Sequence, residues 1–385
     1  MKYYCSTKFT DLQVHVQGRL LYNCCKAYPE RINIEWLEAN PGKLFHTDTM
    51  IEDRKLMLED KSCVSCHFGC YKYEEQGLSS ARLQRSEQEF TDEPKASLKD
   101  LVVALSSDCN LACAYCSPEW STTWQKDIED KGNYELTDFK IENNNFTKLW
   151  TKMKQKTRST ESKFFNLLLK EITLAKDLES ISIIGGEPLL NNQLETFIDQ
   201  IGDKEITIST GLGVSASRLS NILKKIKGKK IKFNVSAETT GSFFEFIRHG
   251  MSWTDFVDRV KMISDHGFEI VFVSTISNIS LFDFTNFYDT FHELYAIRTN
   301  PMSDRPFLMP HVIDARSKEQ FIRSSKKYGN TKAFKNILGL LNIEVNEIDR
   351  SNLSDYIKQF SSRRSLDVDF LPEHFRKWCG LLPAA

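Results

Sequence analysis

The sequence predicts an α/β fold built on parallel strands. From residue 100 onward, short runs rich in β-branched residues alternate with longer stretches that carry apolar residues at three- and four-residue spacing. Repeated strand and helix units of this kind imply a parallel sheet whose strands are joined by helices. The chain has 385 residues, of which 41% are apolar, so it is long enough for one large core and a smaller module.

Six strands and five helices are expected in this part of the chain. The strands are predicted at residues 101–105, 182–184, 205–209, 231–236, 269–274 and 307–309. The helices are predicted at residues 164–176, 193–201, 215–227, 253–266 and 281–294. The pattern alone does not distinguish an open doubly wound sheet from a barrel. In either arrangement, the active site is expected beyond the carboxyl ends of the strands.

The first hundred residues are predicted to form a separate small module. Residues 11–25 alternate apolar and polar side chains around Gly18, which indicates a β-hairpin, and helical pieces follow near Trp36 and at residues 54–58. The segment at residues 87–99 is polar and contains a proline, which indicates a linker. The predicted organisation is therefore a module at 1–86, a linker at 87–99, the α/β domain at 100–312 and a helical C-terminal extension at 313–385.

Charge and hydropathy restrict the possible partners. The 51 basic and 52 acidic residues nearly cancel, which does not indicate a nucleic-acid partner. No segment approaches the ~20 apolar residues that span a bilayer, and the N-terminus lacks the apolar run of a secretory signal. We therefore expect a cytoplasmic protein with no membrane partner.

The cysteines point to metal ligation. Nine of the ten fall into two groups, one before Gly77 and one at residues 109–116, and in a chain that is not exported such grouping favours metal sites over disulfides. Three thiolates at the spacing of Cys109, Cys113 and Cys116 can hold three irons of a cubane cluster and leave the fourth iron open. A zinc knuckle completed by a distant fourth ligand is the alternative for this loop.

This loop resembles that of the radical S-adenosylmethionine (SAM) superfamily. The resemblance is carried by the thiol spacing, by Tyr115 before the last cysteine, and by a Gly-Gly-Glu-Pro run at residues 185–188. It implies a partial (β/α)6 barrel, a 4Fe-4S cluster on the three catalytic cysteines, and SAM bound at the open iron. One electron from a reductant such as flavodoxin or ferredoxin would cleave SAM, and the resulting 5′-deoxyadenosyl radical would abstract hydrogen from the substrate. The chain is thus expected to be a radical SAM oxidoreductase.

The resemblance also implies which residues bind the cofactor. Arg248 would pair with the methionine carboxylate, for which a guanidinium is a suitable forked donor, although a helix-surface ion pair is the alternative for this residue. Asn278 would lie near the adenosine. The other positions that match cofactor-binding positions of relatives are Tyr115, Gly185, Gly186, Glu187, Pro188, Ser236 and Glu238.

The N-terminal cysteines resemble those of the twitch domain, a shortened SPASM module that holds an auxiliary 4Fe-4S cluster. Cys25 is the expected spare thiol, because its neighbour Cys24 points to the opposite face of a strand. Zinc is the alternative metal for this module. The ligands of the auxiliary cluster are expected among Cys5, Cys24, Cys63, Cys66 and Cys70.

Three functions follow from these features. The first is oxidative modification of a peptide or protein side chain, and the second is the same chemistry on a nucleoside, a tRNA base or a sugar-derived small molecule. The third is a non-catalytic iron-sulfur or zinc binding protein. Cleavage of SAM under reducing conditions would separate the third from the other two.

Overall fold

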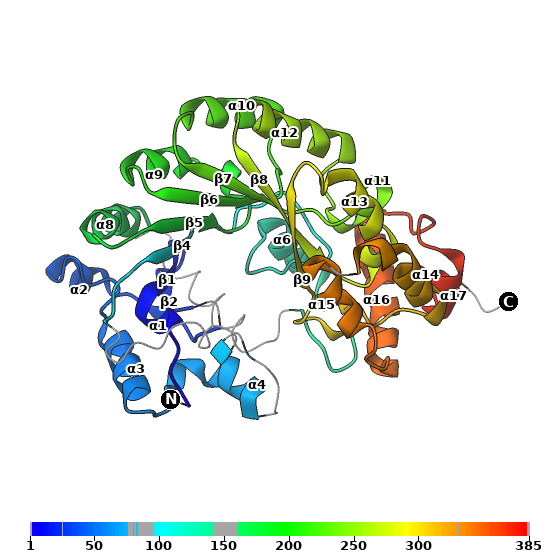
Figure 1. Ribbon diagram of the computed structural model, residues 1–385, viewed down its shortest axis with the longest axis horizontal. Helices are drawn as coiled ribbons and strands as arrows, with labels where there is room; N and C mark the ends of the chain where they lie inside the picture. Colours follow the sequence, from blue (N-terminus) through cyan, green and yellow to red (C-terminus); the bar gives the residue numbers. More distant parts are fainter. Residues whose placement is uncertain are drawn as a thin grey trace. The chain divides into compact units, whose positions relative to one another are not determined.

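The computed structural model describes residues 2–24, 26–75, 80, 82–83, 95–141, 161–329 and 331–382. The chain divides into two compact units, and Figure 1 labels the helices and strands that belong to them. The first unit consists of Met1–Ser107, Asn145–Ile208 and Lys225–Ile231, and the second of Asp108–Asn144, Ser209–Lys224 and Lys232–Ala385. Cys25, Gly77 and the first part of the predicted linker, residues 87–94, lie outside the described residues. The predicted domain boundaries stay predictions.

The first unit contains strands in the order β3-β2-β1-β4-β5-β6. The predicted hairpin is confirmed, because β1 (Asp11–His15) pairs antiparallel with β2 (Leu20–Tyr22), which pairs in turn with β3 (Glu30–Arg31). On its other side β1 pairs in parallel with β4 (Asp100–Ala104). The N-terminal hairpin therefore continues this sheet. The parallel part goes on through β5 (Ser180–Ile184) and β6 (Glu205–Thr210).

Helices of the first unit come from two parts of the chain. The first hundred residues supply α1 (Thr7–Thr10), α2 (Ile34–Ala39), α3 (Asp48–Leu58), the short turns η1 (Val64–Cys66) and η2 (His67–Tyr71), and α4 (Lys72–Glu75). The later part supplies α8 (Glu161–Leu174), the turn η4 (Pro188–Leu190) and α9 (Leu194–Gln200). The amphipathic helices α8 and α9 pack together through buried aromatic side chains, with the Phe165 and Phe197 rings 6.1 Å apart.

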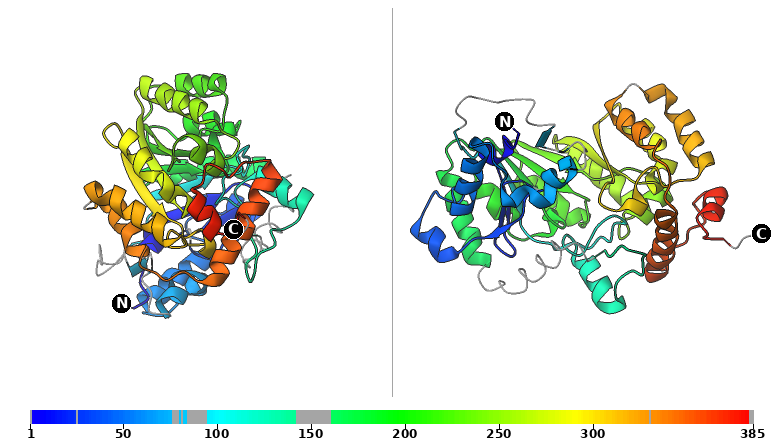
Figure 2. Two further views of the ribbon diagram at one scale, coloured as in Figure 1. Left: turned by 90° about the vertical axis from the view of Figure 1, so that its right-hand side faces the viewer. Right: turned by 90° about the horizontal axis from the view of Figure 1, so that it is seen from below.

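The second unit contains three parallel strands, β7 (Ile231–Val235), β8 (Glu269–Ile276) and β9 (Ala296–Pro301). Phe272 on β8 packs against Phe256 of α12 (Trp253–Asp265) and Phe287 of α13 (Phe284–Phe291). The C-terminal helices lie together at one end of this unit (Figure 2). The other α-helices among the described residues of the unit are α6 (Thr122–Lys131), α10 (Ala216–Lys225), α11 (Gly241–Ile247), α14 (Ala315–Ser325), α15 (Lys332–Leu340), α16 (Glu347–Arg364) and α17 (Glu373–Trp378).

The predicted α/β class is confirmed, and one predicted strand is wrong. Residues 307–309 were expected to form the sixth strand, but Pro306–Leu308 forms the 3-10 turn η6, and the sixth strand is β9. Pro306 fixes its backbone near helical values at the first position of this turn, while Phe307 and Leu308 are buried in the core. The sequence does not predict β9, because its side chains are only partly buried or exposed and therefore show no alternating apolar pattern.

Two further expectations are refined. The helix predicted at 281–294 is interrupted at Asp283, which separates the turn η5 (Ile279–Phe282) from α13. The C-terminal extension is helical as predicted, as far as residue 382. Among the described residues, none of the helices has the length and apolar character needed to cross a membrane.

Candidate active site

The loop that carries Cys109, Cys113 and Cys116 lies in the second unit and leads into α6. The first turn of α6 holds the start of this loop. Ser121, the N-cap residue, donates from its hydroxyl to the carbonyl of Leu111 at 2.9 Å. The hydroxyl of Thr123 donates to the carbonyl of Cys109 at 2.7 Å. These bonds satisfy backbone acceptors of the loop without using its thiols.

Side chains from more distant parts of the second unit hold the rest of the loop. The indole Nε1 of Trp124 donates to the carbonyl of Cys113 at 3.0 Å. Arg305 donates to the carbonyl of Ala114 at 3.1 Å, and the hydroxyl of Tyr356 donates to the same carbonyl. Sequence reasoning missed all three supporting residues, because no local pattern links them to the loop.

The thiols of Cys109, Cys113 and Cys116 lie close to backbone and side-chain groups of the second unit. The Sγ atom of Cys109 accepts from the amide of Leu111 at 3.4 Å, and that of Cys116 lies 3.8 Å from the carbonyl of Ser117. The Sγ atom of Cys113 lies 3.9 Å from Nη1 of Arg248. Burial raises the pKa of Cys113 and raises that of Cys116 to about 12.

The donor set fits an iron-sulfur cluster in its chemistry. Thiolates are the ligands that iron-sulfur clusters take, and binding a metal would remove the thiol protons that burial otherwise retains. No group of three or more His, Cys, Asp or Glu side chains among the described residues is arranged to hold a metal ion as it stands. The structure therefore places the three predicted ligands on one loop but does not gather their sulfur atoms at one point.

Three predicted cofactor-binding residues meet beside Cys113. Glu238 is completely buried and accepts from Nη2 of Arg248 at 2.7 Å and from Nε at 3.2 Å. The hydroxyl of Tyr115 lies 3.1 and 3.0 Å from the two oxygens of the same carboxylate. The guanidinium of Arg248 stands over the Tyr115 ring, 5.0 Å from its centre. Since Arg248 is only 5% exposed, its alternative interpretation as a surface ion pair is wrong.

Burial and charge act in opposite directions in this group. Burial lowers the pKa of Arg248, but the neighbouring Glu238 carboxylate outweighs this effect. The net shift of the pKa is upward, so the guanidinium stays charged. Burial is the main reason that the pKa of Tyr115 is raised, so its phenol keeps its proton. The network is thus a buried ion pair with a neutral hydroxyl donor.

Ser236 and Asn278 also belong to the second unit. The amide of Ser236 donates to the carbonyl of Thr210 at 2.9 Å. Asn278 is completely buried, and its side-chain amide donates to the carbonyls of Phe307 and Val312, both at 2.9 Å. These bonds use both amide hydrogens of Asn278 and tie β8's C-terminal loop to η6. The contact of either residue with a cofactor stays a prediction.

The Gly-Gly-Glu-Pro run belongs to the first unit and follows β5. The amide of Gly186 donates to the carbonyl of Ser106 at 2.9 Å. Gly185, which directly precedes it, has a φ of 143°. The side chain of Glu187 accepts from the amide of Leu189 at 3.2 Å, and Pro188 opens η4. The glycines therefore let the backbone of this run lie against the segment after β4. Contact of the run with the cofactor stays a prediction.

We expect Gly185→Ala to destabilise the first unit. The added Cβ would lie 2.5 Å from the carbonyl oxygen of Ser106, and alanine rarely adopts the φ of Gly185. Such strain costs on the order of 1 to 3 kcal/mol. Urea unfolding followed by circular dichroism measures it. Gly339→Ala within α15 is the control, because its Cβ would meet nothing within 4 Å. Equal unfolding midpoints for Gly185→Ala and wild type would contradict the prediction.

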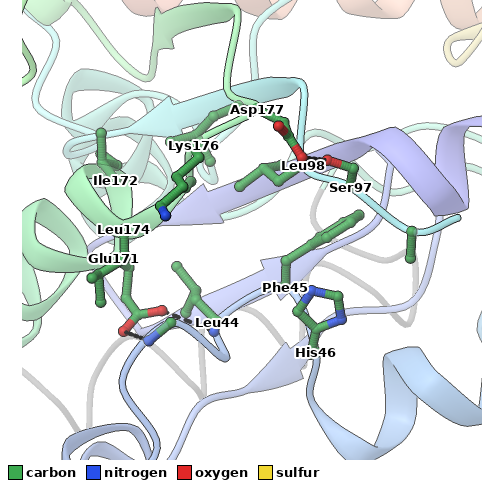
Figure 3. Close-up of a pocket in the computed structure, with 14 residues that line it drawn as sticks. Leu44, Phe45, His46, Ser97, Leu98, Glu171, Ile172, Leu174, Lys176 and Asp177 are labelled. Atoms are coloured by element: carbon green, nitrogen blue, oxygen red, sulfur yellow. Dashed lines mark hydrogen bonds between the residues drawn. The ribbon is translucent and has the colours of Figure 1, made fainter.

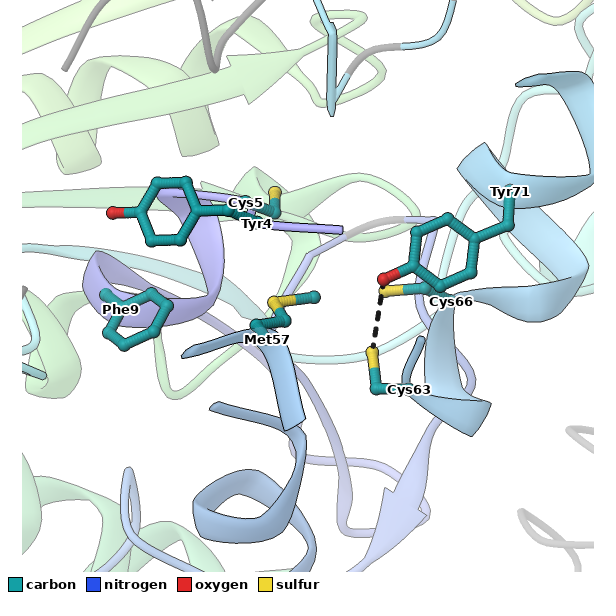
Figure 4. Packing of buried hydrophobic residues seen from close by; sticks show 7 residues of the cluster. All are labelled: Tyr4, Cys5, Phe9, Met57, Cys63, Cys66 and Tyr71. Atoms are coloured by element: carbon teal, nitrogen blue, oxygen red, sulfur yellow. Dashed lines mark hydrogen bonds between the residues drawn. The ribbon is translucent and has the colours of Figure 1, made fainter. Parts of the chain in front are cut away.

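The predicted N-terminal ligands lie in one neighbourhood of the first unit. Cys5, Cys63 and Cys66 are buried in a cluster with Tyr71 and Met57 (Figure 4). A hydrogen bond from Cys66 is the main factor that lowers the pKa of Cys63 to about 6. The remaining two predicted ligands interact electrostatically with members of this cluster, namely Cys70 with Cys5 and Cys24 with Cys66.

A polar network fastens the segment after Cys70 to the start of the chain. The carboxylate of Glu74 accepts from the hydroxyl of Ser80 at 2.5 Å and from Nε of Arg82 at 3.0 Å. Arg82 in turn donates from Nη1 to the carbonyl of Tyr4 at 2.9 Å. Because Tyr4 precedes Cys5, the network holds the Cys70 segment close to Cys5.

A cavity of about 240 Å³ lies elsewhere in the first unit, beside α8 and β4 (Figure 3). The buried carboxylate of Glu171 accepts from the amides of Gly42 and Leu44 at 2.7 and 3.0 Å, which fastens the loop after α2 to α8. Burial raises the pKa of Glu171. None of the predicted site residues lines this cavity.

Comparison with known proteins identifies the domain. Residues 103–290 match the family model described as the Radical SAM superfamily. The chain therefore carries a radical SAM domain, as the thiol spacing predicted.

Curated relatives match a shorter part. The chain is 25% identical over 171 residues to a GTP 3′,8-cyclase from a Sulfurovum species, which covers 44% of this chain and 42% of that protein. It is 26% identical over 140 residues to a GTP 3′,8-cyclase from Campylobacter jejuni, which covers 36% of this chain and 34% of that protein. The chain thus spans less than half the length of these relatives.

Two solved structures show remote likeness. One is described as native anSMEcpe with bound AdoMet, with 11% identity, coverage of 60% of this chain and 59% of that chain, and a TM-score of 0.40. The other is Streptococcus suis SuiB bound to S-adenosylmethionine, with 15% identity, coverage of 88% and 76%, and a TM-score of 0.40. Likeness at these TM-scores is too low to transfer a function.

Proposed function

We propose that this chain is a radical SAM oxidoreductase that modifies a peptide or protein side chain by oxidation. The loop of Cys109, Cys113 and Cys116 carries the proposal. Its carbonyls are bound by side chains from α6, from Arg305 and from α16, and the thiols of Cys113 and Cys116 lie 3.9 Å from Nη1 of Arg248 and 3.8 Å from the carbonyl of Ser117. A loop whose backbone is held in this way can present thiolates to a cluster in a fixed orientation.

The chemistry proposed for this site depends on groups that the chain binds. A 4Fe-4S cluster on Cys109, Cys113 and Cys116, together with SAM and an electron from a flavodoxin or ferredoxin, would supply a 5′-deoxyadenosyl radical for hydrogen abstraction. The protein's own contribution is electrostatic. The buried pair of Glu238 and Arg248 fixes a positive guanidinium beside Cys113, with Nη1 directed at that sulfur. Tyr115 donates to the carboxylate and so holds the pair in one orientation.

The oxidative outcome is inferred from the N-terminal thiols. Five described cysteines lie in one neighbourhood of the first unit, at least as many as an auxiliary cubane with four protein ligands requires, and binding a cluster would have to draw their sulfur atoms together. A fully ligated cluster has no open iron for substrate, so it suits electron transfer. An electron acceptor within the enzyme supports an oxidation of the substrate.

A metal analysis tests the two-cluster proposal. We expect anaerobically reconstituted wild type to carry about eight irons per chain, and the variant with Cys109, Cys113 and Cys116 all changed to Ala to keep about four, as for two separate cubanes. Iron, sulfide and zinc are counted on the same samples. About four irons in wild type, with zinc in place of the rest, would contradict the auxiliary cluster and favour a zinc module.

A purine nucleotide is the second candidate substrate, because the curated relatives that match are GTP 3′,8-cyclases. The two classes are separated by incubating the reduced enzyme and SAM with GTP, and in parallel with a peptide fraction of cell extract. Mass spectrometry then follows the loss of hydrogen from peptides or the appearance of a cyclised nucleotide. A non-catalytic protein would form no 5′-deoxyadenosine in either sample.

A further inference from the structure

A buried lysine lies among the N-terminal thiols, and sequence reasoning did not find it. Lys8 of α1 is 1% exposed. Its Nζ atom lies 2.6 Å from Oδ2 of Asp53, 2.6 Å from Oγ of Ser65 and 3.4 Å from Oδ1 of Asn23. An ammonium group has three N–H donors, so each of them has an acceptor here. This arrangement fits the charged form of Lys8.

The acceptors of Lys8 adjoin the predicted cluster ligands. Asn23 directly precedes Cys24, and Ser65 directly precedes Cys66. Lys8 therefore ties together separate segments that carry candidate thiols. Figure 4 shows Cys66 beside Cys63, which is two residues before Ser65.

One buried carboxylate, that of Asp53, pairs with Nζ of Lys8, and the buried guanidinium of Arg54 donates to the Lys8 carbonyl at 3.3 Å. Burial lowers the pKa of Lys8, but Cys66, Asp53 and Cys63 together raise it more, so the net shift is upward. Asp53 is itself buried, and its Oδ2 also accepts from the hydroxyl of Ser65 at 2.5 Å. A buried ion pair is weak support for stability on its own, because removing two charges from water costs about as much as their attraction returns. The hydroxyl of Ser65, which contacts both Lys8 and Asp53, lies 3.7 Å from Sγ of Cys63 and 4.0 Å from Sγ of Cys66, so the pair stands beside two thiols.

We propose that Lys8 is a positioning residue that favours the reduced state of the auxiliary iron-sulfur cluster, with Asp53 as the opposing charge. This inference rests on the proposed function, because it requires a cluster on the N-terminal thiols. A cluster gains one negative charge on reduction. A buried cation close to its ligands therefore stabilises the reduced state, and a buried anion destabilises it.

The test measures the reduction potential of the auxiliary cluster alone. The full-length variant with Cys109, Cys113 and Cys116 changed to Ala is the background, and redox titrations are followed by electron paramagnetic resonance. Lys8→Met is expected to lower the potential and Asp53→Asn to raise it. We expect each change to alter the equilibrium constant for reduction about tenfold, or about 59 mV for one electron. Lys55→Met on α3 is the matched control, because its side chain is 63% exposed, and it should cause no shift.

The opposite signs separate this proposal from a merely structural ion pair. A structural pair predicts that both single variants weaken the cluster in the same way, and that result would overturn the proposal. If Lys8→Met fails to retain iron, the double variant Lys8→Met/Asp53→Asn removes both charges and is expected to keep its iron at a potential between those of the single variants. Loss of iron from the double variant as well would overturn the proposal.

The failure of this proposal is distinguishable from that of the proposed function. Unchanged potentials in variants that carry about four irons would overturn the role of Lys8 alone. A complete lack of auxiliary iron in the background variant would overturn both the role of Lys8 and the auxiliary cluster. SAM cleavage by wild type would then still test the site at Cys113 independently.

Discussion

Replacing any one of Cys109, Cys113 or Cys116 with Ala is expected to abolish the formation of 5′-deoxyadenosine. Each thiolate is one of only three protein anchors for the cluster, so the loss of one leaves a cubane that cannot hold its open iron in place. The loop itself should survive, because its carbonyls are held by Trp124 and other side chains that the substitution does not touch. Anaerobic reconstitution, reduction with dithionite and chromatography of the SAM products measure the effect.

Cys379→Ala is the matched control for these variants. Cys379 is 3% exposed at the end of α17, so this change also removes a buried thiol from the second unit. A buried cysteine that only fills space should be replaced without loss of SAM cleavage. Wild-type cleavage by any of the three loop variants would show that this thiol does not hold the catalytic cluster, and equal loss in Cys379→Ala would show that the loss is not specific to the loop.

The radical SAM domain could be predicted because its signal is local in the sequence. The spacing of Cys109, Cys113 and Cys116 reports a ligand geometry within eight residues, and the confirmed strands β4 to β8 have apolar runs that report burial directly. Strand β9 could not be predicted in this way. Its residues are partly buried or exposed, so the backbone pairing with β8 defines it without help from an apolar pattern.

The support of the site could not be predicted because it depends on contacts between distant positions. Arg305 and Tyr356 bind the carbonyl of Ala114 across sequence separations of 191 and 242 residues. Neither an arginine in a loop, like Arg305, nor a tyrosine in a helix, like Tyr356, has a local sequence pattern that indicates such a partner. The burial of Lys8 could not be predicted either, because a lysine normally lies at the surface and its partners are distant in the sequence.

The sequence match assigned Glu238 and Arg248 to the cofactor separately, and the structure revises how their roles can be tested. Two nitrogen atoms of Arg248 are bound by Glu238, and Nη1 is directed at Cys113. A loss of SAM affinity in Arg248→Ala would therefore combine a lost contact with the exposure of an unpaired carboxylate. The effect of the ion pair on stability has to be measured first.

Arg248→Met is expected to destabilise the second unit by ~3 to 5 kcal/mol, because it leaves the fully buried carboxylate of Glu238 without its counter-charge. The double variant Arg248→Met/Glu238→Leu should recover most of this loss, since it removes both buried charges. Urea unfolding monitored by tryptophan fluorescence measures the cycle on metal-free protein. Arg323→Met on α14 is the control, because Arg323 and its partner Glu319 have side chains that are 74% and 70% exposed, so their pair should contribute little.

The double variant decides between two roles for the pair. If it recovers stability but binds SAM as weakly as Arg248→Met in calorimetry on reconstituted protein, Arg248 or Glu238 contributes to SAM binding beyond the structural role of the pair. If it recovers both stability and SAM affinity, the pair only supports the loop, and the predicted contact of Arg248 with the methionine carboxylate is wrong. A double variant no more stable than Arg248→Met would show that the Glu238 carboxylate does not destabilise the single variant. This result would contradict the electrostatic basis of the prediction.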